Sequence, residues 1–260
     1  MIDSHLHLDD AKFDQSRQQI IDGLAEHGVE FVINNSCDLQ SMEKGVELAR
    51  NERVFATVGM HPHTSKDFDR SFANRMETLA LHPKVVAVGE IGLDYFYDLS
   101  DRKIQRDVFA EQLEIADRLG LPVTLHVREA YGDAQDILRA QRKFLNNGVL
   151  WHCYGGSGEF ARQRAKEGHY FAFGGAITFK NANKGEVLQN VPLSQILSET
   201  DSPYMAPVPL RGTVNTPYNV RFVVQKIAEC YGVSFEQAEN AIRQNTLRLF
   251  PKIETFLNKL

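Results

Sequence analysis

The sequence predicts an α/β fold, a (β/α)8 barrel, on two observations. Short runs rich in β-branched residues recur along the chain, and each is followed by a segment whose apolar residues have helical spacing. This alternation is typical of a parallel sheet built from βαβ units. Eight such repeats favour a closed barrel, because a doubly wound open sheet more often has five or six strands. Residues 1–260 are therefore expected to form a single domain with an extra C-terminal helix.

The eight expected strands are short and largely apolar. They lie near residues 1–6, 29–34, 53–59, 85–91, 121–126, 148–152, 170–174 and 194–199. Alternate residues of a strand share a face, so Val86, Val88 and Glu90 are expected to point the same way, as are Thr124 and His126. In a barrel, one of the two faces of each strand fills the interior.

The helices are predicted from apolar residues that recur every three or four positions. Between the fourth and fifth strands this series runs from Ile104 to Leu119, and Gly120 is suited to end the helix. After the eighth strand, a polar and proline-rich loop leads to a helix that is expected to open at Pro217. The last helix is expected to start at Ser234, where the sequence SFEQ offers a capping box.

Composition excludes several classes of protein. The 34 acidic and 29 basic residues give a net charge of −5, so no broad cationic surface is expected to grip a nucleic-acid duplex. The three cysteines are far apart and form no CxxC motif, which is typical of a reducing compartment and predicts a cytoplasmic location. The chain has neither a signal-peptide pattern nor a long apolar run, so we expect no membrane association. No obligate protein partner is indicated.

Residues able to bind metal ions lie at the predicted carboxyl ends of the strands. They are His5, His7, His61, Glu90, His126, His152 and Asp201. These strand ends converge on one face of a barrel, the face where catalytic groups collect. This many imidazoles and carboxylates exceeds the needs of one tetrahedral ion with a vacant position, and it suits two divalent cations bridged by a carboxylate. Mixed nitrogen and oxygen donors permit Zn, Mn, Fe, Ni or Co and suit a magnesium-only site less well.

The prediction of a metal site depends on all of these residues occurring together at strand ends. A single histidine in a strand is more often a hydrogen-bonded core or surface residue. The remaining histidines lack this placement and are interpreted as solvated or structural: His27, His63, His82 and His169. Asp3 and Glu199 are expected to support the site by orienting histidines through the ring nitrogen that does not face the metal.

Nine short motifs follow one another along nearly the whole chain. They are DSHLHLDD, VGMHPH, AVGEIGLDY, LPVTLHVREA, WHCYGGS, FAFGGAITFK, SETDSPYMAP, RGTVNTP and NTLRLF. In this order they resemble the TatD family of metal-dependent hydrolases, within the wider amidohydrolase-like barrels. The resemblance implies a TIM-type barrel with two divalent ions per chain, Mg, Mn, Zn or similar. It also implies a deoxyribonuclease acting on 3′ ends, although some related members are assigned to deacylation.

The resemblance also implies roles for individual residues. One ion would be bound by His5, His7, Asp201 and Glu90, and the other by His126, His152 and Glu90 as the bridge. His61 would face the substrate. Two departures from the family pattern, Tyr97 and Gly156, lie beside the expected substrate cleft, so they bear on substrate preference and not on the metal site.

We therefore expect a phosphodiesterase, a deoxyribonuclease of the 3′–5′ exonuclease type that acts on a single-stranded DNA end or another phosphoester. In this hypothesis the metal pair lowers the pKa of a bridging water, and Asp201 accepts its proton during attack on phosphorus. Glu90, Asp201 and His61 would be the catalytic residues. Arg128, Arg211 and His61 are expected to hold the phosphate, although a surface arginine can equally form an ordinary ion pair. Asn215 could contact the substrate, but either Asn215 or Thr216 could instead be the N-cap of the following helix.

Two other functions are compatible with such a barrel. An amide, lactone or ester hydrolase, including a deacylase of aminoacyl-nucleic acid, would use the same ligands, because an activated water also attacks a carbonyl carbon. A non-catalytic metal-binding or nucleic-acid-binding barrel would instead lack some ligands or carry a basic face. The complete ligand set and the net charge of −5 disfavour this last alternative.

Overall fold

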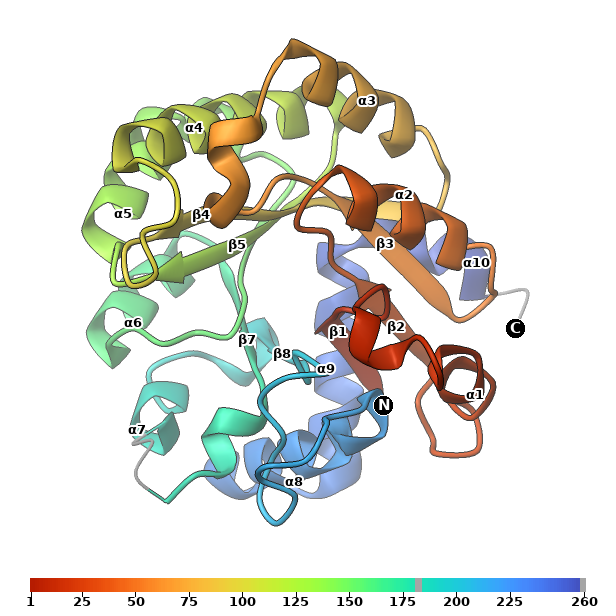
Figure 1. Ribbon diagram of the computed structural model, residues 1–260. Coiled ribbons are helices and arrows are strands. Elements are labelled where there is room, and N and C mark those ends of the chain that lie inside the picture. The colour runs from red at the N-terminus through yellow and green to blue at the C-terminus, as the bar shows by residue number, and fades with distance from the viewer. Residues whose placement is uncertain (181–183, 258–260) are drawn as a thin grey trace.

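The chain folds into a barrel of eight parallel strands, as the computed structural model shows for residues 1–180 and 184–257 (Figure 1). The strands are β1 (Ile2–Leu6), β2 (Phe31–Asn34), β3 (Val54–Val58), β4 (Val85–Asp94), β5 (Val123–Arg128), β6 (Val149–Trp151), β7 (Tyr170–Phe173) and β8 (Ile196–Ser198). Each strand pairs with the next in sequence order, and helices alternate with the strands along the chain. The predicted (β/α)8 barrel is confirmed, with all eight strands at their expected places.

The first and last strands complete a nearly closed barrel. The β8 end is joined to β1 by a hydrogen bond from the Asp201 N–H to the His5 carbonyl at 2.9 Å. A second hydrogen bond, from the His7 N–H to the Ser202 carbonyl, measures 2.8 Å. These bonds connect the first strand to the segment after the last strand. Residues distant in sequence therefore become neighbours at the carboxyl end of the barrel.

Helices surround the strands (Figure 1). They are α1 (Arg17–Asp22), α2 (Leu39–Leu48), α3 (Arg70–Ala80), α4 (Arg102–Leu119), α5 (Tyr131–Ala140), α6 (Gly158–Lys166), α7 (Lys184–Leu188), α8 (Val220–Tyr231), α9 (Phe235–Leu249) and α10 (Glu254–Leu257). The predicted end of α4 is confirmed, since Gly120 adopts the left-handed conformation with φ of 65°. The predicted capping box of α9 is also present, between Ser234 and Gln237. In the described part of the chain, no helix is both long enough and apolar enough to cross a bilayer.

The amino end of the barrel is filled by apolar side chains. One buried cluster joins the strand residues Ile2, Phe31 and Leu197 to Phe250 and Ile253, which follow α9. Phe250 and Ile253 have no exposed surface. The C-terminal segment thus closes the barrel at the amino ends of its strands and leaves the carboxyl ends for polar groups.

The strand β4 departs from simple alternation. Its pairing register shifts between β3 and β4 and again between β4 and β5. As a result Val86 belongs to the interior cluster, whereas Val88 packs in the outer cluster beneath the helices. The prediction that Val86, Val88 and Glu90 share a face is therefore wrong for Val88, because an irregularity in a strand moves later side chains to the other face.

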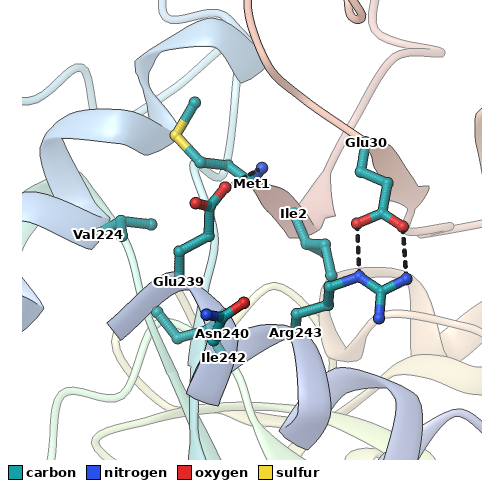
Figure 2. Close-up of a pocket in the computed structure, with 8 residues that line it drawn as sticks. All are labelled: Met1, Ile2, Glu30, Val224, Glu239, Asn240, Ile242 and Arg243. Carbon is teal, nitrogen blue, oxygen red and sulfur yellow. Dashed lines mark hydrogen bonds and ion pairs between the residues drawn. The ribbon is translucent and has the colours of Figure 1, made fainter. Parts of the chain in front are cut away.

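A pocket of about 230 Å³ lies at the amino end of the barrel (Figure 2). It is lined by Met1, Ile2, Glu30, Val224, Glu239, Asn240, Ile242 and Arg243. Among its polar contacts is a bidentate pair, in which the Arg243 guanidinium donates to both oxygens of Glu30 at 2.8 Å. None of the predicted metal-binding residues lines this pocket; Ile2 is the first residue of β1, and Glu30 directly precedes β2.

Candidate metal centre

The seven residues predicted at strand ends come together at the carboxyl end of the barrel, and Glu90 of β4 lies at their centre. Its Oε2 atom is 3.3 Å from Nε2 of His5 and 3.8 Å from Nε2 of His7. Its Oε1 atom is 2.7 Å from Nδ1 of His126 and 2.9 Å from Nε2 of His152. Each oxygen of one buried carboxylate therefore faces a different pair of histidines.

Asp201 joins the first of these pairs. Its Oδ1 atom lies 3.4 Å from Nε2 of His7 and 3.9 Å from Nε2 of His5. The residue lies in the segment that follows β8 and has a φ of 55°, a left-handed conformation that is uncommon outside glycine. Such backbone conformations are held in place by surrounding contacts and are frequent at functional sites.

The first group of donors fits a divalent cation. Both ring nitrogens of His5 are buried without a hydrogen-bond partner, which is costly for a polar group unless another species binds there. Nδ1 of His7 lies 2.9 Å from the carbonyl oxygen of Asn35, which can only accept, so the ring proton sits on Nδ1. The lone pair of His7 is then on Nε2, which faces Glu90 and Asp201.

The second group is supported from behind by Glu199. The Oε2 atom of Glu199 lies 3.5 Å from Nδ1 of His152, on the side of the ring opposite Glu90. Its Oε1 atom accepts the backbone N–H of Cys153 at 2.6 Å. Glu199 thus lies on the side of His152 where it was predicted, but among the residues that the structure describes neither Nδ1 of His152 nor Oε2 of Glu199 makes a hydrogen bond, so its orienting role stays a prediction.

The charges around the site favour a cation. Burial alone would raise the pKa of Glu90, but the nearby His152, His5 and His61 outweigh burial and hold that pKa well below its ordinary value. Burial would likewise raise the pKa of Asp201, and the hydrogen bond with His7 lowers it below its ordinary value. Both carboxylates are therefore ionised at neutral pH, as ligands of a divalent ion must be.

Asp3 does not act on an imidazole ring. Its buried carboxylate accepts the backbone N–H of Thr200 at 2.9 Å and the backbone N–H of His5 at 3.3 Å. The hydroxyl of Thr200 also donates to it. The prediction that Asp3 orients a histidine through its ring nitrogen is wrong, because these bonds use the carboxylate to join β1 to the β8 end.

Asp94 was not among the predicted site residues, and His63 was placed outside the site. Oδ2 of Asp94 lies 3.0 Å from Nε2 of His126 and 2.9 Å from Nε2 of His63. The strand β4 continues to Asp94, whereas the prediction ended it at residue 91. Extending the alternation from Glu90 by four residues would have found Asp94, since even spacings keep one face. The interpretation of His63 as remote from the site is corrected accordingly.

The two arginines lie at the surface, each against an aromatic ring. The Arg128 guanidinium stacks 3.8 Å from the ring centre of Phe96, and that of Arg211 lies 4.3 Å from the ring centre of Phe179. Within the described residues neither arginine pairs with a carboxylate, so both charges are available to another partner.

Asn215 is occupied by structural bonds. Its amide group donates to the carbonyls of Thr200 and Tyr204 at 2.9 and 2.8 Å, and its oxygen accepts the backbone N–H of Thr216 at 3.0 Å. The side chain has no exposed surface. These contacts hold the loop before α8, which is neither of the two roles considered for Asn215; the residue at the N-cap position before Pro217 is Thr216, and its side chain makes no capping hydrogen bond.

Comparison with known proteins agrees with the geometry. The model of the TatD related DNase family matches residues 2–251. The "uncharacterized metal-dependent hydrolase YabD" of Bacillus subtilis (strain 168) is 34% identical over 252 residues, which cover 96% of this chain and 98% of that protein. The protein of the same description named YcfH, from Escherichia coli (strain K12), is 34% identical over 256 residues, covering 96% and 95%.

A solved structure shows the same fold. The crystal structure of YjjV, a TatD homolog from Escherichia coli K12, superposes with a TM-score of 0.91 at 29% sequence identity, covering 96% of this chain and 98% of that one. The family match over almost the full length and the two relatives above 30% identity lead to one conclusion: this protein belongs to the TatD family of metal-dependent hydrolases.

Proposed function

We propose that the protein is a divalent-metal-dependent phosphodiesterase, a deoxyribonuclease of the 3′–5′ exonuclease type. The observation that carries this proposal is the placement of Glu90, whose two oxygens face two histidine pairs. His5, His7, Asp201 and Glu90 would hold one ion, and His126, His152 and Glu90 the other. Divalent ions held by these residues would polarise a phosphoryl oxygen and lower the pKa of a bound water. Mg, Mn, Zn or a similar ion would serve.

Asp201 is the group of the chain best suited to accept a proton from the attacking water. The hydrogen bond with His7 lowers the pKa of its carboxyl group, which favours the ionised form, and its side chain keeps 16% of its surface exposed. A positioned carboxylate that accepts a proton during attack typically accelerates hydrolysis by about 10²- to 10⁴-fold.

His61 is arranged as a hydrogen-bond donor. Its Nδ1 atom accepts the backbone N–H of His63 at 3.1 Å, so the single proton of the neutral ring lies on Nε2. Burial lowers the pKa of His61 to about 3, which keeps the ring neutral. Nε2 lies 3.5 Å from Oε1 of Glu90 and thus points into the site. From there it would donate to an oxygen of the phosphate, which supports a substrate-facing role for His61.

The rim of the site offers aromatic and cationic groups for a single nucleic-acid strand. Phe96 and Tyr97 expose 49% and 52% of their surfaces, and Tyr204 on the loop after β8 exposes 43%. Such rings can stack on bases, while Arg128 and Arg211 supply charge for the phosphates. Local contacts of this kind suit a chain whose net charge is −5. A cytoplasmic location is part of the proposal, and the absence of a disulfide among the three cysteines is compatible with it.

The test compares two panels of substrates with the protein loaded with Mn²⁺. We expect release of mononucleotides from a single-stranded oligonucleotide with a free 3′ hydroxyl, and none from the same oligonucleotide blocked at its 3′ end. The second panel contains amide, lactone and ester substrates. Hydrolysis of the second panel alone would overturn the proposed phosphodiesterase function and would indicate an acyl hydrolase. Absence of hydrolysis on both panels, with both ions bound, would indicate a non-catalytic barrel.

A further inference from the structure

The buried carboxylate of Asp94 holds two different parts of the site. Its Oδ2 atom lies 3.0 Å from Nε2 of His126 and 2.9 Å from Nε2 of His63. Its Oδ1 atom accepts the backbone N–H groups of Phe96 and Tyr97 at 3.0 and 2.8 Å. Asp94 has no exposed surface, so these protein groups are its hydrogen-bond donors.

The backbone of Asp94 is fixed in turn by α4. Gln105 of that helix accepts the Asp94 N–H through Oε1 at 2.9 Å and donates through Nε2 to the Asp94 carbonyl at 3.2 Å. Gln105 is also fully buried. A residue held at its N–H, its carbonyl and both carboxylate oxygens has little freedom to move relative to His126.

The proton of His126 has two possible places. Both of its ring nitrogens face carboxylates, Nδ1 toward Glu90 at 2.7 Å and Nε2 toward Asp94 at 3.0 Å, but a neutral imidazole carries one N–H. A cation beside Glu90 requires a lone pair on Nδ1. The proton must then be on Nε2, where Asp94 accepts it.

We propose that Asp94 is a positioning residue that fixes His126 in the Nε2–H tautomer and thereby presents Nδ1 to the second ion. This inference rests on the metal site of the proposed function and adds a residue to it. The same carboxylate sets the turn of Phe96 and Tyr97, against which Arg128 stacks, so one group links a metal ligand to the aromatic rim. His63, whose ring lies edge-on to Tyr97 at 5.3 Å, is its second imidazole partner.

The substitution Asp94→Asn tests the tautomer directly. The variant has a single side-chain oxygen, and the two backbone N–H groups of Phe96 and Tyr97 hold it in the turn. The amide NH₂ then faces Nε2 of His126, which must accept, so the ring proton moves to Nδ1 and blocks the second ion. We expect the affinity for one of the two Zn²⁺ ions to fall about 10- to 100-fold, with the other affinity unchanged. Chelator competition measures both affinities.

Nitrogen NMR of the histidine rings supplies a second measurement that does not depend on activity. In the Zn²⁺-loaded protein we expect His126 to show a protonated Nε2 and a metal-bound Nδ1. Binding through Nε2 would overturn the inference even if Asp94→Asn does not fold. The matched control is His63→Gln, which removes the other imidazole partner of Asp94 and should leave both affinities and the His126 tautomer as in the wild type.

Three further outcomes have distinct meanings. Wild-type affinities and tautomer in Asp94→Asn would overturn the inference. An equal loss of affinity in Asp94→Asn and His63→Gln would also overturn it, because general loosening of the pocket would then explain both. A wild-type protein that binds no divalent ion at His126 would instead remove the metal site on which the proposed function depends.

Discussion

Oε1 of Glu90 lies 2.7 Å from Nδ1 of His126, while Oε2 of the same carboxylate lies 3.3 Å from Nε2 of His5. Replacing Glu90 with Gln should therefore lower the occupancy of both ions together. The neutral amide removes the negative charge between the two histidine pairs. It also replaces one carboxylate oxygen with an NH₂ group, which cannot bind a cation. Metal content per chain, measured after equilibration with Mn²⁺, checks this expectation.

The control for Glu90→Gln is Glu111→Gln, the same chemical change at an exposed position of α4. It should keep the wild-type metal content. Loss of only one ion from Glu90→Gln would contradict the bridging role and would assign Glu90 to a single ion.

Replacing Asp201 with Asn should lower kcat by about 10²- to 10⁴-fold when the metal concentration is high enough to fill the site. The amide cannot accept the proton of the attacking water, while its oxygen can still face His7. Rates and metal content are measured on the same preparation. Near-normal hydrolysis by a fully loaded Asp201→Asn protein would rule out the role of proton acceptor.

Replacing Tyr97 with Ala should weaken binding of a single strand without changing the metal content. Stacking of one base on an aromatic ring contributes about 1–3 kcal/mol, so KM for a single-stranded oligonucleotide should rise by roughly 5- to 150-fold. The control is Leu81→Ala, which truncates a side chain that is 78% exposed just after α3, near the amino end of β4. Equal KM values for the wild type and Tyr97→Ala would exclude the rim at Tyr97 from substrate binding.

Much of the fold could be predicted because its signals are local. The end of α4 at Gly120 and the start of α9 at Ser234 depend on the conformation or hydrogen bonding of a few adjacent residues. The placement of His5 and Asp201 beside each other also followed from sequence, once both were assigned to strand ends of one barrel. In such a fold, topology alone converts positions along the chain into neighbours.

The errors at Val88 and Asp3 arise from features that the alternation of side chains along a strand does not reveal. The register shifts of β4 move Val88 to the outer face. Asp94 was missed for a different reason, because the predicted strand ended at residue 91 and the alternation from Glu90 was not extended to it. Asp3 was expected to orient an imidazole ring, but its carboxylate accepts the backbone N–H groups of His5 and of Thr200, which follows the neighbouring strand β8. Pairing between distant segments decides such contacts, and a single sequence contains no direct record of them.

The only tryptophan of the chain is hydrogen-bonded to a buried histidine outside the candidate metal centre. Nε1–H of Trp151 donates to Nδ1 of His169 at 2.9 Å, and an indole nitrogen can only donate, so His169 is neutral in the folded state. Burial, with a smaller contribution from the charge of Arg164, lowers the pKa of His169 to about 4. His169 is thus structural, as its position away from the predicted strand ends indicated.

This lowered pKa predicts the direction in which acid affects stability. Between the ordinary histidine pKa of about 6.5 and a pKa of about 4, the unfolded chain binds a proton that the folded protein does not. The contribution of neutral His169 to the free energy of unfolding is fully present above pH 6.5 and is lost as the pH falls toward 4. Its size is at most about 3 kcal/mol. In His169→Gln, the amide oxygen can accept the Trp151 N–H without titrating. The free energy of unfolding of this variant, followed by tryptophan fluorescence in urea at constant metal concentration, should therefore decrease less than that of the wild type between pH 7 and pH 4. Parallel pH profiles for the two proteins would show that His169 does not contribute to acid sensitivity.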